Sequence, residues 1–237
     1  HKLRDDDVPV ASLVHDPEVE LTALTHKRNP SIPLPADIFH SEGRRNSAGF
    51  DLDAPALAAP FMTELERLTK SPMWTAAPLI SGSVQPGEAS RVVDPSDNRR
   101  ILGNVAEATL AQVDQALTVA QKAQPAWAHT PVEDRARALD KAADLFEQHR
   151  SELVALIVRE AGRTVKNAIA EVREAVDLCR YYASCARYDL TPFLLPGYTG
   201  ETNQMRHVGR GLVAAISPWN FPLAIFVGQV SAALVAG

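Results

Sequence analysis

The residue with the most evident chemical potential is Asn220, which stands between two apolar segments in the run Ala214–Phe226 (AAISPWNFPLAIF). We expect a buried strand over Gly211–Ser217 and a helix from Pro222. Polar side chains at the end of such a strand lie where open α/β sheets bind ligands. The side-chain amide of Asn220 is therefore a candidate donor to a developing oxyanion. From spacing alone, an N-cap of the following helix is the simpler role, because Asn is a favoured cap.

Three carboxylates, Glu171, Glu174 and Asp177, recur every three residues in a segment expected to be helical. This spacing makes them neighbours on one helical face. A carboxylate there could hold a substrate ammonium group. Alternatively, the three belong to a solvated acidic face that includes Arg173 and Arg180, and spacing alone favours this second interpretation.

Several common catalytic signatures are missing. None of the 12 glycines forms a Gly-x-Gly-x-x-Gly motif, although backbone at a strand end and an open helix N-terminus can hold an anion without it. The seven histidines show no metal-ligand spacing, and no Ser or Cys lies in a Gly-x-Ser-x-Gly elbow. Cys179 and Cys185 match neither a Cys-x-x-Cys pair nor a zinc knuckle. The sequence thus offers no metal site and no nucleophile paired with a general base.

The composition is that of an ordinary soluble globular protein: of 237 residues, 46% are hydrophobic and 22% are charged. A net charge of -5 argues against a nucleic-acid-binding surface. No apolar stretch approaches the roughly 20 residues that cross a bilayer. The segment His1–Val10 lacks the apolar core of a signal peptide, so we expect the true N-terminus to lie elsewhere. The two cysteines fit a reducing, cytoplasmic setting.

The prolines divide the chain into two regions. Residues 1–75 hold eight of the 17 prolines, and this spacing forbids long helices. We therefore expect a connector or wrapping arm there, with short helices at Ser12–Leu24 and Ala56–Thr69. Residues 76–237 carry more regular patterns and are expected to form an α/β fold.

The second region begins with a predicted β-hairpin, in which Arg91–Val93 and Arg100–Val105 flank the turn-rich Asp94–Asn98. Two helices are then expected to start at capping boxes, Thr109–Gln112 and Thr130–Glu133. Each has apolar residues at helical spacing, which predicts one buried face. These residues are Val113, Ala116, Leu117 and Ala120 in the first helix, and Val132, Ala136, Leu139, Ala143 and Phe146 in the second.

Two further helices follow. One is expected over Ser151–Glu160, ending at Gly162 as a left-handed cap. A longer one is expected from Thr164 to about Tyr188, and an extended stretch over Glu201–Val208. The apolar stripe of the long helix comprises Ala168, Val172, Ala175, Cys179, Tyr182 and Ala186.

A series of short motifs, in order along the chain, resembles the aldehyde dehydrogenase superfamily from about residue 78 onward. Single motifs of this kind are weak, but the ordered series is specific. The motifs are Val93–Pro95 with Ile101–Val105, Ala126-Trp127 before Glu133–Arg135, Glu160–Arg163 with Glu171, Arg180–Ala183, and Ile216–Pro222.

Within that superfamily, further segments resemble the proline utilization A family, bifunctional bacterial flavoenzymes that join a proline dehydrogenase barrel to a glutamate semialdehyde dehydrogenase. This likeness covers nearly the whole chain and implies that residues 1–75 correspond to the connector between the two modules. The segments are Asn29–Pro35, Gly43–Gly49, Ala168–Asp177, Gly200–Asn203 and Ser217–Phe226.

The resemblance implies a role for seven residues. Asn220 corresponds to the oxyanion donor, and Phe221 to an aromatic wall of the aldehyde pocket. Glu174, more loosely, corresponds to a helix position facing the substrate tunnel, where a carboxylate suits the amino group of an amino-acid semialdehyde. The strand end that lines the NAD site corresponds to Ile216, Ser217, Pro218 and Trp219.

The resemblance also implies what lies outside the chain. In the family the catalytic Cys, the general-base Glu and a cofactor-binding Lys all follow the Trp-Asn motif, so Cys179 and Cys185 are not the nucleophile. The flavin site belongs to the barrel module, so FAD is not expected here. We therefore expect the N-terminal part of an NAD-binding domain, with a β-hairpin and an incomplete parallel sheet, that is inactive alone.

Two alternatives stay open. The parent could be a stand-alone NAD(P)-dependent aldehyde dehydrogenase with another substrate, or the chain could be a non-catalytic helical scaffold derived from such an enzyme. Expected partners are a small semialdehyde and the rest of the same polypeptide. A homo-oligomer and a membrane-associated parent are both compatible with the sequence.

Overall fold

The computed structural model describes residues 7–25, 28–70 and 73–237. Contacts between Cα atoms divide the chain into two units, residues 1–34 and residues 35–237. The first six residues of His1–Val10, on which the signal-peptide argument rests, lie outside the described residues. The proposed boundary at residue 75 stays a prediction.

The first unit contains two short helices, α1 (Val10–Leu13) and α2 (Pro17–Ala23). The prediction of a single helix over Ser12–Leu24 is therefore wrong. The break lies before Pro17, because the residue preceding a proline is disfavoured in helical conformation. That residue, Asp16, is extended and accepts a hydrogen bond from the backbone N–H of Glu18 at 2.9 Å, which caps α2.

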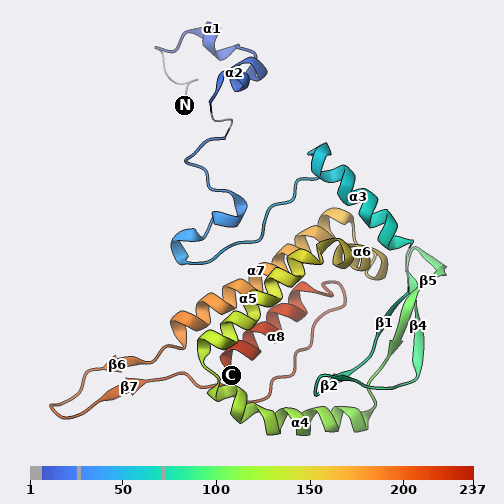
Figure 1. Cartoon of the computed structure of the whole chain (residues 1–237), viewed down its shortest axis with the longest axis vertical. Helices are drawn as coiled ribbons and strands as arrows, with labels where there is room; N and C mark the ends of the chain where they lie inside the picture. Colours follow the sequence, from blue (N-terminus) through green and yellow to red (C-terminus); the bar gives the residue numbers. More distant parts are fainter. Residues whose placement is uncertain (1–6, 26–27, 71–72) are drawn as a thin grey trace. The chain divides into compact units, whose positions relative to one another are not determined.

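The body of the second unit is helical. Its helices are α3 (Pro55–Thr69), α4 (Leu110–His129), α5 (Val132–Gln148), α6 (Arg150–Glu160), α7 (Val165–Asp189) and α8 (Ala224–Ala236). Helices α5, α7 and α8 lie side by side (Figure 1). Two short 3₁₀ turns, Pro35–Asp37 and His40–Glu42, precede α3.

The buried core forms two clusters that share α7, as expected for a helix with a continuous apolar stripe. The first joins α5, α7 and α8 through Ala136, Leu139, Ala143, Ala175, Val176, Cys179, Ala183, Ala186, Val227 and Val235. The second joins α3, α6 and α7 through Phe61, Leu65, Val154, Ala155, Ile157, Ala168, Ile169 and Val172. The predicted faces of α5 and α7 are thus confirmed.

The predicted β-hairpin is confirmed as β4 (Ala89–Asp94) and β5 (Asp97–Ala106). A third strand, β1 (Trp74–Ala76), pairs with β5 in parallel, so the sheet is mixed. Gly103 permits this pairing, because a Cβ at that position would lie 2.0 Å from the carbonyl oxygen of Trp74. Two smaller hairpins pair β2 (Leu79–Ile80) with β3 (Ser83–Val84) and β6 (Phe193–Leu195) with β7 (Asn203–Met205).

The helix-start predictions have mixed outcomes. The Thr109–Gln112 capping box is present in full, and Thr164 caps α7 through the backbone N–H of Asn167. The second capping box is wrong, because Thr130 ends α4 and makes no cap bond to α5, whose N-cap is Pro131. Gly162 has φ +65° just beyond α6, as predicted.

The apolar face predicted for α4 is not buried: Val113 is 42% exposed and Leu117 is 50% exposed. The buried strand predicted over Gly211–Ser217 is also wrong. The chain there is irregular, and Ile216 is 84% exposed. A strand requires a partner for its backbone groups, and no described strand pairs with this segment.

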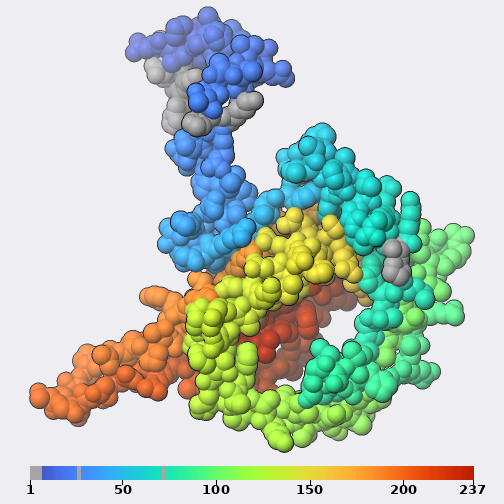
Figure 2. Space-filling model, viewed as in Figure 1, coloured from blue at the N-terminus to red at the C-terminus, as the bar shows by residue number. Residues whose placement is uncertain are grey.

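The β6–β7 hairpin stands out as an arm from the helices of this unit (Figure 2). Strand β7 lies within the stretch Glu201–Val208 that was predicted to be extended, and β6 precedes this stretch. No helix in the described part of the chain is both long enough and apolar enough to span a membrane.

Candidate functional site

Asn220 lies in a turn between the irregular segment 206–218 and α8. Helix α8 starts at Ala224 with Leu223 as its N-cap residue, so Asn220 is not the cap. Its backbone carbonyl accepts a hydrogen bond from Nη1 of Arg163 at 2.5 Å. Its side chain is exposed and makes no hydrogen bond to any residue that the structure describes. The amide is thus available to a ligand.

A buried carboxylate, Glu171, occupies the N-terminus of α8. Its Oε1 accepts hydrogen bonds from the backbone N–H groups of Leu223 at 2.8 Å and Ala224 at 3.4 Å. Its other oxygen, Oε2, lies 3.1 Å from Nη1 of Arg163 and forms an ion pair with it without a hydrogen bond. A negative charge here also interacts favourably with the helix dipole. The N-terminus of α8 is therefore filled by a carboxylate of the protein itself.

Arg163 contacts three groups at this junction. Besides Glu171 and the carbonyl of Asn220, its guanidinium lies over the ring of Phe221, 4.5 Å from the ring centroid. Phe221 is half-buried as a result. Two consecutive residues of the Trp-Asn-Phe motif are therefore held by one arginine from the loop between α6 and α7.

The three acidic residues of α7 have separate environments, so the prediction of one solvated acidic face is wrong. Glu171 is only 2% exposed. Asp177 accepts hydrogen bonds from the backbone N–H and the hydroxyl of Ser47, at 2.6 and 2.8 Å. Arg180, expected on the same face, is buried and pairs with Asp144 and Glu147. Burial of the α7 stripe brings these charges into the interior.

Glu174 alone among the three is exposed. It lines an open cavity of about 490 Å³ together with Phe39, Arg44, Arg173 and Tyr181. None of the residues from Ile216 to Phe221 lines this cavity. The structure therefore does not bring Glu174 together with Asn220.

The four residues expected to line the cofactor site, Ile216 to Trp219, form a strip in which three residues are exposed and Ser217 is half-buried. Trp219 is 84% exposed, like Ile216. The carbonyl of Ile216 accepts a hydrogen bond from Nε2 of Gln229 on α8 at 3.1 Å, which attaches the strip to that helix. Ser217 is half-buried and Pro218 is exposed. The strip offers backbone groups and an indole face to a ligand.

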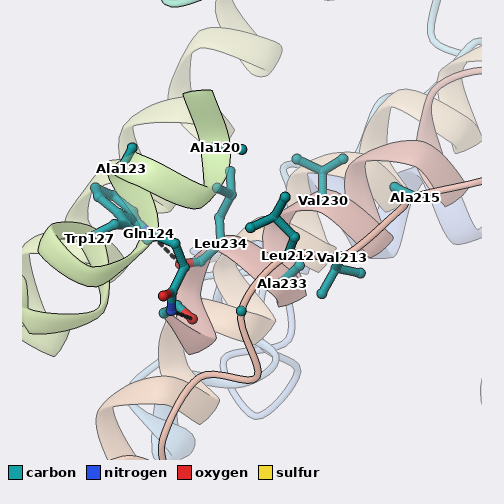
Figure 3. A pocket seen from close by; sticks show the side chains of 12 residues that line it. Ala120, Ala123, Gln124, Trp127, Leu212, Val213, Ala215, Val230, Ala233 and Leu234 are labelled. Carbon is teal, nitrogen blue, oxygen red and sulfur yellow. Dashed lines mark hydrogen bonds between the residues drawn. The ribbon is translucent and has the colours of Figure 1, made fainter. Parts of the chain in front are cut away.

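An apolar cavity of about 300 Å³ lies between α4, α8 and residues 211–215, just before the strip in the chain (Figure 3). Trp127 and Leu234 line it, and the indole N–H of Trp127 donates to the carbonyl of Leu234 at 2.7 Å. Its lining includes Leu212 and Val213 but no charged side chain. It offers apolar packing rather than chemistry.

Neither cysteine belongs to the site. Cys179 is buried in the core, and burial raises the pKa of its thiol to about 11. Cys185 lies two turns further along α7 and is half-buried. The described residues hold no cluster of His, Cys, Asp and Glu that could bind a metal ion.

Sequence reasoning missed the roles of Arg163 and Glu171. One signal for Glu171 was present: it lies three residues after Ala168 and four before Ala175, on the apolar stripe of α7. A carboxylate on a buried stripe needs partners. One partner, Arg163, lies in the preceding loop, but the backbone amides of α8 come from more than 50 residues further along, which no local pattern reveals.

Comparison with known proteins shows which protein family the chain belongs to. Residues 83–237 match the aldehyde dehydrogenase family, and the chain belongs to that family. Over its whole length it is 42% identical to the bifunctional protein PutA of Klebsiella aerogenes, and it covers 18% of that protein. The chain therefore spans less than a fifth of this curated relative.

Two solved structures show the same similarity. Proline utilization A from Bdellovibrio bacteriovorus, inactivated by N-propargylglycine, is 33% identical with a TM-score of 0.79, over 98% of this chain and 23% of that one. A 1-pyrroline-5-carboxylate dehydrogenase from Thermus with bound NAD is also 33% identical, with a TM-score of 0.74, over 81% of this chain and 38% of that one.

Proposed function

We propose that this chain forms part of an NAD-dependent dehydrogenase that oxidises L-glutamate γ-semialdehyde, the open form of 1-pyrroline-5-carboxylate, to glutamate within a bifunctional proline-catabolic polypeptide. The 42% sequence identity to PutA over the whole chain supports the placement within a bifunctional polypeptide. The 33% sequence identity to a 1-pyrroline-5-carboxylate dehydrogenase supports the choice of substrate. The observation that carries the proposal is the free, exposed amide of Asn220 on a backbone that Arg163 holds in place.

In this proposal Asn220 stabilises the oxyanion that forms when a thiolate adds to the aldehyde carbonyl. Removal of one such donor costs about 10²–10³ in kcat in other enzymes. Phe221 contributes an apolar wall for the aldehyde. The attacking Cys and the Glu that activates water would come from residues outside this chain, because both cysteines here lie on α7.

The strip Ile216–Trp219 could contact a nicotinamide cofactor, whereas the N-terminus of α8 restricts where its phosphates can bind. Its exposed backbone and indole can contact a flat ring and its ribose. The N-terminus of α8, however, is not open to a phosphate, because Glu171 already accepts from Leu223 and Ala224. NAD supplies the hydride acceptor when bound, and the strip of this chain would orient it.

Glu174 is a separate candidate, as a partner for the substrate amino group. Its cavity is lined by two arginines, Arg44 and Arg173, and by a second carboxylate, Asp177, which is already bound to Ser47. We therefore base the substrate assignment on Asn220 and Phe221, and keep Glu174 as a subsidiary candidate.

The test is to compare the purified 237-residue chain with the longer polypeptide that carries it. We expect the longer polypeptide to reduce NAD with glutamate γ-semialdehyde, and the chain alone to show no turnover. Turnover by the chain alone would mean that the nucleophile lies within it. A longer polypeptide that oxidises another aldehyde but not this semialdehyde would favour the alternative aldehyde dehydrogenase.

A further inference from the structure

The junction before α8 depends on one arginine nitrogen. Nη1 of Arg163 donates to the carbonyl of Asn220 at 2.5 Å and lies 3.1 Å from Oε2 of Glu171. Oε1 of the same carboxylate accepts from the first backbone amides of α8. The turn is thus attached at both ends, to Arg163 of the α6–α7 loop through the Asn220 carbonyl and to Glu171 of α7 through Leu223.

This arrangement leaves the reactive group of Asn220 free. The backbone of Asn220 is held by its carbonyl, while its side-chain amide is exposed and makes no hydrogen bond to the described residues. The side chains of Arg163 and Glu171 are 18% and 1% exposed, so water screens their interaction little. An oxyanion donor acts only when its position is set before the charge develops.

We propose that Arg163 and Glu171 are positioning residues, which hold the turn so that the Asn220 amide points at the reacting carbonyl oxygen. This inference rests on the proposed function, and it adds Arg163 and Glu171 to the residues expected to bind substrate, cofactor or the oxyanion. Oε2 of Glu171 has Arg163 as its sole partner among the described residues. Loss of Arg163 therefore releases the Asn220 carbonyl and leaves a buried carboxylate oxygen unpaired.

The experiment uses the longer polypeptide and the substitution Arg163→Met, which keeps the apolar stem and removes the guanidinium. We expect kcat for semialdehyde oxidation to fall about tenfold to a hundredfold, the range for a displaced catalytic group. KM for aldehyde and NAD should change less than threefold. Arg163→Lys, which keeps a cation within reach of both oxygens, should retain most of kcat.

A double-mutant cycle separates positioning from a general structural effect. If Arg163 acts through Asn220, the variant Arg163→Met/Asn220→Ala should lose no more activity than Asn220→Ala alone. Losses that multiply would overturn the proposal, as would an unchanged kcat in Arg163→Met. Should Arg163→Met fail to fold, Glu171→Gln carries the same cycle, because it removes the charge that holds Arg163.

The chain offers a control in Arg159, which pairs with the buried Asp94 at 3.2 Å and makes no hydrogen bond or ion pair to the described residues of the turn. Arg159→Met removes a comparable ion pair and should leave kcat per folded molecule unchanged. A loss equal to that of Arg163→Met would contradict a specific role for Arg163.

Hydrogen exchange gives a readout that needs no activity. In peptides spanning residues 219–226, amide exchange should be faster in Arg163→Met than in the parent and in Arg159→Met. Equal exchange would overturn the holding role. If the parent polypeptide oxidises no aldehyde with NAD, the proposed function fails, and the exchange data alone then decide whether Arg163 and Glu171 hold the turn.

Discussion

Asn220 illustrates how a single side chain becomes available for chemistry. Its carbonyl is bound by Arg163 and its amide is left exposed, so the residue contributes to the turn without using its reactive group. The sequence left two roles open, a helix cap or an oxyanion donor. The start of α8 at Ala224 removes the first, and the second remains a proposal.

The two cysteines provide a residue-scale prediction. Burial raises the pKa of Cys179 to about 11, so at pH 8 only about one thiol in a thousand is the reactive thiolate. Cys185 is half-buried on the same helix. We expect iodoacetamide at pH 8 to label Cys185 well before Cys179 in the native protein, as measured by peptide mass spectrometry. As a control, Cys179→Ala should leave the rate of Cys185 labelling unchanged. Equal labelling rates of Cys179 and Cys185 in the parent would contradict the burial of Cys179.

At the scale of elements, residues 46–48 are attached to α5 and α7 by buried polar groups. Glu147 accepts two hydrogen bonds. The backbone N–H of Ala48 donates to its Oε1 at 3.0 Å, and Nη2 of Arg180 donates to its Oε2 at 2.9 Å. Arg180 also donates to the carbonyl of Asn46 at 3.2 Å. Together with the contacts of Ser47 to Asp177, these bonds fix a segment that has no regular structure.

Glu147 makes this attachment sensitive to pH. Burial alone would raise its pKa, but hydrogen bonds from Arg180 and Ala48 outweigh burial and lower the pKa below the ordinary 4.5. A lowered pKa in the folded state means that Glu147 contributes stability above pH 4.5, which is lost as the pH falls through the folded value. The attachment is therefore intact at neutral pH and weakens in acid.

We predict that Glu147→Gln lowers the free energy of unfolding by about 1–3 kcal/mol at pH 7, as for loss of a charged hydrogen bond. The difference from the parent should shrink near pH 3, measured by urea denaturation at both pH values. Glu66→Gln, at an exposed pair 3.9 Å from Lys70, should cost less than about 0.5 kcal/mol. A difference that persists undiminished in acid would show that the charge of Glu147 is not responsible.

The elements that sequence predicted correctly are those with local signals. The hairpin β4–β5, the caps at Thr109 and Thr164, and the stripe of α7 all follow from residues within a few positions of one another. The prediction for Thr130 was wrong because this residue suits both the end of one helix and the start of the next. In the structure it ends α4.

The errors concern long-range pairing. The segment Gly211–Ser217 has the composition of a buried strand, yet a strand forms only with a neighbour, and none among the described strands pairs with it. Likewise Glu171 and Arg180 resemble surface charges until packing buries them against partners distant in sequence. Of the candidate site, the motif itself was predictable, whereas the residues that hold it were not.

At the scale of the molecule, the chain belongs to the aldehyde dehydrogenase family and spans less than a fifth of a PutA relative. The active site would be divided between this chain and the rest of a longer polypeptide. This chain would supply the oxyanion donor, its positioning residues and a strip for the cofactor. The nucleophile and the base would come from elsewhere in a longer polypeptide, so only that polypeptide can test the division.

The measurement that tests the central claim most directly is the steady-state rate of NAD reduction with glutamate γ-semialdehyde by the longer polypeptide and its Asn220→Ala variant. We predict that kcat falls about 10²–10³-fold, because the oxyanion loses a donor, while the affinity for NAD is unchanged. A variant that retains the parent kcat would contradict the assignment of Asn220 and with it the proposed division of the site.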